Sequence, residues 1–186
     1  MSRIGFTTSR SPANKTRSFV HDIIGVIPKS ERIVRGSSKL LMCITGMKNR
    51  GIETAVVIHS IKGNPNFMRI FDLKAEPKEL PYAIKIRGLT LSREYRKKQR
   101  KKKPAFALLI SSLKRPEEEH VIRQIFGVTQ EGIENLQDKE YVTLYADYID
   151  KEQDIIYIEF LNKHNQQVGP RMKIRIVPRE PENLLN

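Results

Sequence analysis

The feature that most limits how this chain can fold is a run of positive charge at its middle, residues 92–103. Eight of these twelve residues are lysine or arginine and one is acidic. Charges at this density repel one another and cannot be buried, so the run must lie in solvent or against a polyanion. We therefore expect two folded parts, residues 1–89 and 105–186, joined by an exposed basic connector at residues 90–104.

The charge is distributed unevenly along the 186 residues. Residues 81–103 carry ten basic side chains and one acidic one, whereas residues 104–186 carry ten basic and 14 acidic ones. A single basic run is often only a solubilising loop. The net charge of +13 and the isoelectric point near 9.9 favour a nucleic acid as its partner.

The first part of the chain is predicted to alternate strands and helices before it ends in a hairpin and a further strand. A helix is expected to begin at Ser11-Pro12, because serine suits an N-cap and proline suits the first helical position. A second helix is expected to open at Gly36-Ser37-Ser38. The predicted strands, which are rich in β-branched residues, are Ile4–Thr8, Glu31–Arg35, Thr54–Ile61, Phe67–Leu73 and Tyr82–Leu89.

The second part repeats this order of elements. A strand at Ala105–Ser111 precedes a helix opened by Glu117–Glu119, and a hairpin and a final strand follow. The turn Ser112–Pro116 also resembles Thr8–Pro12. The chain is therefore predicted to be an α/β protein made of two structurally related halves, although the common α/β order of elements could produce the same pattern.

Composition argues against a membrane protein or a disulfide-stabilised one. The uninterrupted apolar runs are far too short to cross a bilayer, and the single cysteine, Cys43, cannot form an internal disulfide. A reducing, cytoplasmic location is expected.

No pattern typical of catalysis or metal binding is found. The chain has no phosphate-binding glycine-rich loop and no cysteine or histidine pair at metal-ligand spacing, so we expect no enzyme activity, no metal and no cofactor. A Cys43–His59 nucleophile pair is conceivable, but both residues are expected in the core. The acidic cluster at residues 147–154 lacks calcium-loop spacing and is expected to be a solvated turn.

A second basic surface is predicted where the first two helices begin. Backbone N–H groups at helix N-termini bind phosphate, and turns that leave the carboxyl ends of neighbouring parallel strands lie at one edge of a sheet. The candidate RNA-binding residues of these two turns are Ser9, Arg10, Lys15, Arg17, Arg35, Gly36 and Lys39, and Arg32 is a further basic residue that flanks the second turn. Those of the central run are Arg93, Arg96, Lys97, Lys98, Arg100, Lys101, Lys102 and Lys103.

Four segments of the first half resemble the Brix domain. They are Phe6-Thr-Thr-Ser-Arg10, Glu31-Arg-Ile-Val-Arg35-Gly36, Val57-Ile-His59 and Gly63-Asn-Pro-Asn66. The resemblance is to the short archaeal form and is strongest between residues 4 and 73. It implies two related α/β halves, similar to an anticodon-binding domain, that form one Brix domain.

The resemblance also implies a function in ribosome biogenesis. Thr8, Ser9, Arg10, Arg35 and Gly36 belong to the family's motif, for which binding rather than turnover is implied. The leading hypothesis is a non-catalytic assembly factor that binds precursor ribosomal RNA through phosphate and shape contacts during rRNA processing. The alternative is a scaffold whose acidic second half docks a ribosomal or assembly protein.

Overall fold

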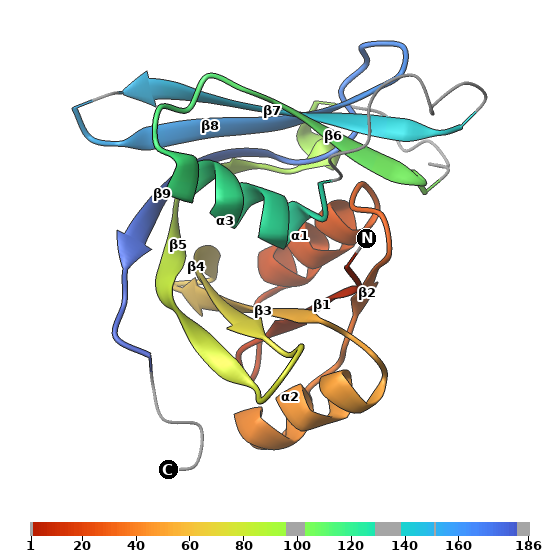
Figure 1. Ribbon diagram of the computed structural model, residues 1–186, viewed down its shortest axis with the longest axis vertical. Helices are drawn as coiled ribbons and strands as arrows, with labels where there is room; N and C mark the ends of the chain where they lie inside the picture. The colour runs from red at the N-terminus through yellow and green to blue at the C-terminus, as the bar shows by residue number, and fades with distance from the viewer. Residues whose placement is uncertain (1, 96–102, 129–138, 151, 182–186) are drawn as a thin grey trace.

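A single curled sheet forms the body of the protein (Figure 1). The computed structural model describes residues 2–95, 103–128, 139–150 and 152–181. Among these residues, nine strands pair in the order β2-β1-β3-β4-β5-β9-β8-β7-β6.

The first five strands and two helices come from the first half. Strand β1 lies between β2 and β3 and is parallel to both, and β3, β4 and β5 continue the sheet antiparallel. The elements are β1 (Ile4–Thr8), α1 (Asn14–Ile24), β2 (Ser30–Arg32), α2 (Leu40–Asn49), β3 (Thr54–Ile61), β4 (Asn64–Asp72) and β5 (Lys78–Thr90).

Among its described residues, which leave out 129–138, the second half has the same connectivity without a counterpart of β2 and α2. Strand β6 is parallel to β7, and β7, β8 and β9 are antiparallel, as are β3, β4 and β5. Its elements are β6 (Phe106–Ser111), α3 (Pro116–Phe126), β7 (Tyr141–Asp150), β8 (Ile155–Asn162) and β9 (Arg171–Pro178). The α/β prediction is therefore confirmed.

The two halves are joined more closely than two meeting units would be. The last strands of the halves, β5 and β9, pair antiparallel from Tyr82↔Pro178 to Thr90↔Arg171, so hydrogen bonding continues across the whole sheet. Helices α1 and α3 both lie inside the curl (Figure 1), and one apolar core contains buried residues of both halves. Helix α2 covers the opposite face of the first half over a smaller core.

Some boundaries differ from the predicted ones. Helix α1 begins at Asn14 rather than at Pro12, and β2 ends at Arg32 although backbone pairing continues from Ile33 to the carbonyl of Phe6. Strand β5 extends through Thr90, and the next residue, Leu91, is fully buried. The start of the proposed connector thus belongs to the folded body, while residues 96–102 lie outside the described residues.

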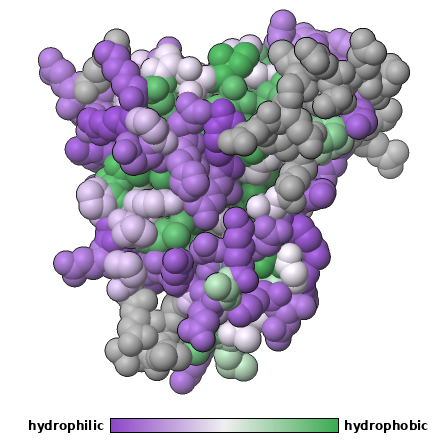
Figure 2. Space-filling model, viewed as in Figure 1, coloured by the Kyte–Doolittle hydropathy of each residue, from purple (hydrophilic) through white to green (hydrophobic). Residues whose placement is uncertain are grey.

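The face of the molecule that Figure 2 shows is mainly hydrophilic. Figure 2 shows apolar side chains only in small patches on one face of the molecule. Across the part of the chain that the structure describes, no helix has the length and apolar character needed to span a membrane.

Candidate nucleic-acid interface

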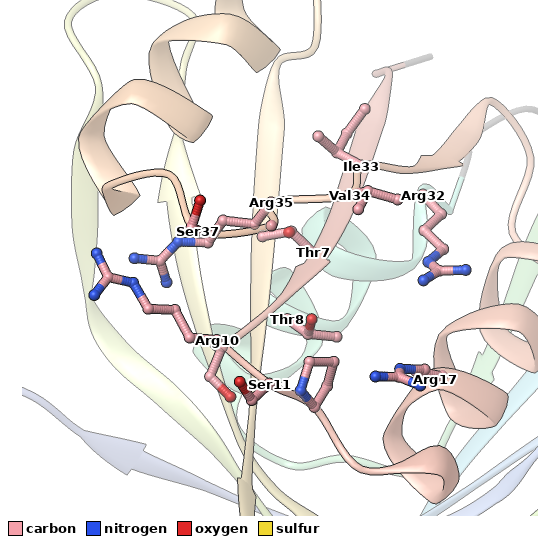
Figure 3. A pocket seen from close by; sticks show the side chains of 13 residues that line it. Thr7, Thr8, Arg10, Ser11, Arg17, Arg32, Ile33, Val34, Arg35 and Ser37 are labelled. Carbon is pink, nitrogen blue, oxygen red and sulfur yellow. The ribbon is translucent and has the colours of Figure 1, made fainter.

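A basic hollow of about 540 Å³ lies where β1 and β2 end (Figure 3). The turn from β1 to α1 forms one wall, and the chain from β2 toward α2 forms the other. The parallel pairing of β1 and β2 places these two turns at one edge of the sheet. The lining residues are Thr7, Thr8, Ser9, Arg10, Ser11, Pro12, Arg17, Arg32, Ile33, Val34, Arg35, Gly36 and Ser37.

Four arginines stand around this hollow in two pairs. Figure 3 shows Arg10 beside Arg35 at one end, and Arg17 with Arg32 at the other. Arg35 Nε donates to the Ser38 carbonyl (2.9 Å), and an Arg32 Nη1 lies 3.0 Å from His21 Nε2. None of the ion pairs between described residues involves any of the four arginines.

The electrostatics of Arg35 reflect this uncompensated charge. Partial burial lowers its pKa, and the positive charge of Arg10 lowers it further. The guanidinium nevertheless stays protonated, because arginine titrates far above physiological pH. An anion bound between the two side chains would relieve their repulsion.

Gly36 gives the second wall its shape. It has φ of +58°, a left-handed conformation that favours glycine, and a hydrogen bond from Ser38 N to the Arg35 carbonyl (3.2 Å) closes the turn.

The N-terminus of α1 opens beside the hollow. Its N-cap is Ala13, which supplies no side-chain hydrogen bond, and its first turn has no acidic residue. The first N–H groups of a helix have no partner within the helix, and the helix dipole makes this end positive. The backbone therefore adds to the positive potential of the four arginines.

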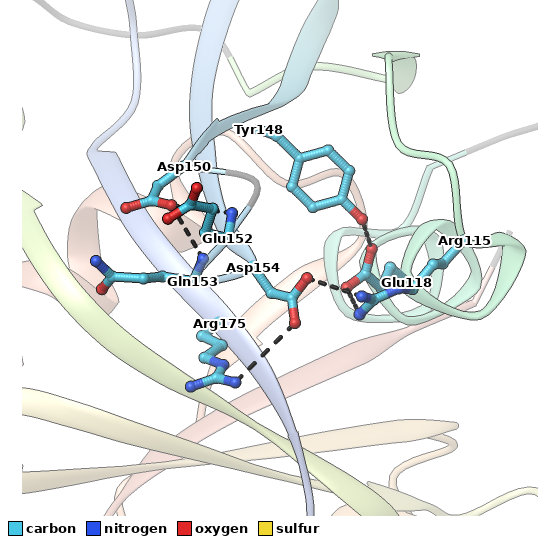
Figure 4. Close-up of polar contacts among 8 residues, drawn as sticks. All are labelled: Arg115, Glu118, Tyr148, Asp150, Glu152, Gln153, Asp154 and Arg175. Atoms are coloured by element: carbon cyan, nitrogen blue, oxygen red, sulfur yellow. Dashed lines mark hydrogen bonds and ion pairs between the residues drawn. The ribbon is translucent and has the colours of Figure 1, made fainter.

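The corresponding turn of the second half is neutralised from within. Arg115, before α3, pairs with Asp154 at 2.8 Å and with Glu118 at 3.4 Å (Figure 4). Glu118 accepts a hydrogen bond from the Tyr148 hydroxyl, and Asp154 also lies 4.0 Å from Arg175. Carboxylates of the chain thus pair with the arginine that follows β6, whereas no carboxylate among the described residues pairs with the arginines that line the basic hollow.

The other predicted residues lie apart from this hollow. Lys15 lines a second hollow, Lys39 is the exposed N-cap of α2, and Arg93 Nη1 donates to Ser18 Oγ at 3.3 Å. Lys103 donates to the Ser30 carbonyl at the start of β2, whereas the basic hollow lies at its end. The remaining predicted residues lie outside the described residues: Arg96, Lys97, Lys98, Arg100, Lys101 and Lys102.

Cys43 and His59 occupy packing positions. Cys43 is 8% exposed, its Sγ lies 4.0 Å from Thr7 Oγ1, and burial raises the pKa of its thiol. A raised pKa keeps the thiol protonated, the opposite of an activated nucleophile. The His59 ring packs edge-to-face on Phe67. Within the described ranges, no group of histidine, cysteine and acidic residues is arranged to hold a metal ion.

Sequence reasoning missed the second hollow, which includes Asn64, Asn66 and Arg87. Asn64, Pro65 and Asn66 begin β4, and nothing local in the sequence indicated that the last part of β5 would lie beside them.

Comparison with known proteins identifies relatives among archaea. A protein of Pyrobaculum aerophilum is 29% identical over 126 residues, which cover 67% of this chain and 68% of the relative. One of Sulfurisphaera tokodaii is 27% identical over 176 residues, 95% of this chain and 93% of the relative. Both are described as probable Brix domain-containing ribosomal biogenesis proteins. The chain is therefore similar to archaeal Brix-domain proteins along nearly its whole length.

Some relatives extend well beyond the matched segment. A Brix-domain protein of Pyrococcus horikoshii is 34% identical over 90 residues, but these cover only 39% of its length. No family model matches the chain.

Two solved structures share this architecture. The probable ribosomal biogenesis protein of Aeropyrum pernix has a TM-score of 0.77 at 23% identity and matches 97% of both chains. The archaeal Imp4-like protein Mil has a TM-score of 0.62 at 20% identity, covering 94% of this chain and 99% of its own. The single curled sheet is therefore a fold that these proteins have in common.

Proposed function

We propose that this protein is a non-catalytic assembly factor of ribosome biogenesis that binds precursor ribosomal RNA through its phosphates. The observation that carries the proposal is the basic hollow, which is lined by four arginines without a described carboxylate partner and lies beside an uncapped helix N-terminus. Arginine suits phosphate oxygens because its planar fork donates two parallel hydrogen bonds. The names of the archaeal relatives support ribosomal RNA as the source of these phosphates.

The test is RNA affinity across a salt series for the double variant Arg10→Ala, Arg35→Ala. Each phosphate neutralised on a single strand contributes roughly 0.7 to the slope of log affinity against log salt. Losing two such contacts should reduce the steepness of the slope by about 1 to 1.5 and weaken binding to a labelled ribosomal RNA fragment.

The matched control is Lys74→Ala, Lys114→Ala, which removes the same charge from exposed positions outside the hollow. An equal loss of affinity in the control would show that only net charge matters. An unchanged slope in the arginine variant would remove the hollow from the interface.

The central run is proposed to add affinity that does not depend on RNA sequence. Lys103 is left in place in the test because it contacts Ser30. Six serine substitutions should reduce the steepness of the salt slope by about 2, which is half of what full engagement would give. They should weaken binding to ribosomal and unrelated RNA alike. The substituted residues are Arg96, Lys97, Lys98, Arg100, Lys101 and Lys102. A slope equal to that of the unsubstituted protein would make the run a solubilising loop.

A protein partner is proposed for the outer face of the second half. No described helix covers this face, and the residues Ile110 and Ile149 are 53% and 50% exposed on it. Ile110→Glu and Ile149→Glu should therefore leave RNA affinity unchanged. A fall in RNA affinity would assign the face to the RNA interface instead.

A further inference from the structure

A second hollow of about 270 Å³ lies at the end of the β3–β4 hairpin. It is formed by three elements that are distant in sequence: the first turn of α1, the start of β4 and the last part of β5. Its lining residues are Lys15, Asn64, Pro65, Asn66, Ile86, Arg87, Gly88 and Leu89.

A buried contact fixes α1 against the hairpin. Thr16, on the first turn of α1, is fully buried, and its Oγ1 lies 2.7 Å from Oγ of Ser60 on β3. Ser60 pairs with Pro65 across the hairpin, so the turn and the helix N-terminus hold a fixed relation. Lys15 and Arg17, on either side of Thr16, line the second and the first hollow respectively. Residues two apart point to nearly opposite sides of a helix, so the two hollows flank the N-terminus of α1.

A β-bulge brings Arg87 to the second hollow. Ile86 pairs with Ile174 and Gly88 with Lys173, so Arg87 is the extra residue of β5. Bulges bend a strand and redirect a side chain, and they are common beside functional sites. Arg87 is exposed and lines the hollow together with its neighbours in β5.

The lining combines an apolar floor with a polar rim. Pro65 is buried and Ile86 is 5% exposed, whereas Lys15, Asn66 and Arg87 reach solvent. No described residue pairs with the amide of Asn66, which offers both a donor and an acceptor. An apolar surface edged by an amide and two cations matches a nucleotide, which has a flat apolar face, a polar edge and a phosphate.

We propose that this second hollow holds an unpaired base of the RNA strand whose phosphates lie in the basic hollow. The inference rests on the proposed function and adds to it a preference for single-stranded segments. A strand that crosses the N-terminus of α1 meets phosphate ligands on one side and the base site on the other. A base within a duplex cannot enter, because A-form RNA keeps its bases stacked and its major groove too narrow for side chains.

The experiment compares a short unstructured RNA with the same sequence annealed to its complement. Asn66→Ala and Arg87→Ala should each weaken binding of the single strand roughly five- to tenfold and change binding of the duplex less than about twofold. The double variant Arg10→Ala, Arg35→Ala should weaken binding of both the single strand and the duplex. The controls are Asn49→Ala for the amide and Lys114→Ala for the charge, and neither residue lines either of the two hollows. Thermal unfolding checks that each variant is folded. If Asn66→Ala does not fold, Arg87→Ala alone provides the test.

The outcomes separate the two proposals. An equal loss on single strand and duplex overturns the base site, and so does unchanged affinity for the single strand. If the arginine double variant alone loses affinity, the base site fails and the proposed function stands. If the unsubstituted protein binds neither RNA, both fail.

Discussion

Glu79 is a buried carboxylate that contacts two arginines. It is 4% exposed, and its two carboxylate oxygens accept from Arg69 Nε at 2.7 Å and Arg69 Nη2 at 2.6 Å. Arg179, which follows β9, donates to the same carboxylate at 2.6 Å. The trio ties β4, β5 and the C-terminal segment together.

Removing this carboxylate should strongly destabilise the fold. Glu79→Ala leaves the buried charge of Arg69 without its carboxylate partner. Removing one partner of a buried ion pair lowers the free energy of unfolding by about 3–5 kcal/mol. Urea unfolding measures the change in the free energy of unfolding. The comparison is Glu31→Ala, whose pair with Arg3 is 38% and 48% exposed and should contribute about 0–1 kcal/mol. If the two variants lost similar amounts of free energy of unfolding, burial of the Glu79 pair would not explain its contribution.

Tyr148 predicts a stability change at alkaline pH. Burial, and then its hydrogen bond to Glu118, raise the pKa of its hydroxyl to about 12. The folded state therefore favours the neutral tyrosine, whereas an unfolded tyrosine ionises near pH 10. The neutral Tyr148 hydroxyl therefore contributes fully to the free energy of unfolding below about pH 10, and this contribution is lost as the pH rises toward 12.

The free energy of unfolding should thus fall between pH 10 and 12 more steeply in the unsubstituted protein than in Tyr148→Phe. Unfolding curves at successive pH values measure the difference. At neutral pH the variant should be less stable by about 1 kcal/mol, because it loses one hydrogen bond. If the free energy of unfolding fell equally with pH in both proteins, the pKa of Tyr148 would not be raised by folding.

At the scale of elements, α1 lacks a favourable N-cap. Ala13 has the extended conformation of an N-cap residue, with φ of −66° and ψ of 160°, but it has no side-chain acceptor. A helix N-terminus without a cap is suboptimal for stability, and one without a nearby carboxylate is favourable for binding an anion.

Two substitutions at this residue should separate stability from binding. Ala13→Ser and Ala13→Asp should each stabilise the protein by about 1 kcal/mol by capping the helix. Ala13→Asp should also weaken RNA binding, because its negative charge lies beside the basic hollow, whereas Ala13→Ser should weaken it less. Melting curves and RNA titrations measure the two effects. Equal RNA affinity of the two variants would place the RNA away from α1.

At the scale of the whole molecule, the sheet and the core make the halves interdependent. Strands β5 and β9 pair at the centre of the sheet, and Tyr82 Oη of β5 donates to Gln124 Oε1 of α3 at 3.0 Å. Gly127, the left-handed C-cap of α3, approaches Ile4 of β1 so closely that an added Cβ would lie 3.1 Å from its Cδ1.

The complete chain should therefore unfold in one transition, and residues 1–104 alone should not fold cooperatively. The fragment would expose the edge of β5 and leave α1 without the core that it shares with α3. Thermal unfolding followed by circular dichroism compares the two chains. A fragment that melts cooperatively at the temperature of the complete chain would show that the halves are independent.

The sequence by itself determined the strands and the cations at the turns. Strands Ile4–Thr8 and Thr54–Ile61 have their predicted limits, because their β-forming composition is a local signal. The parallel order of the first strands was also sufficient to bring Arg10 and Arg35 to one edge.

Only the tertiary structure decided which strands meet and which charges are compensated. The alternation of residues in β5 and β9 is the same for an edge strand and for a central one, so sequence could not show that they pair. The tertiary fold also supplied Arg115 with carboxylates, whereas Arg10 pairs with none in the part of the chain that the structure describes. The physical reason is range: periodicity and turn chemistry act over a few residues, whereas pairing and charge compensation depend on contacts between residues far apart in the chain.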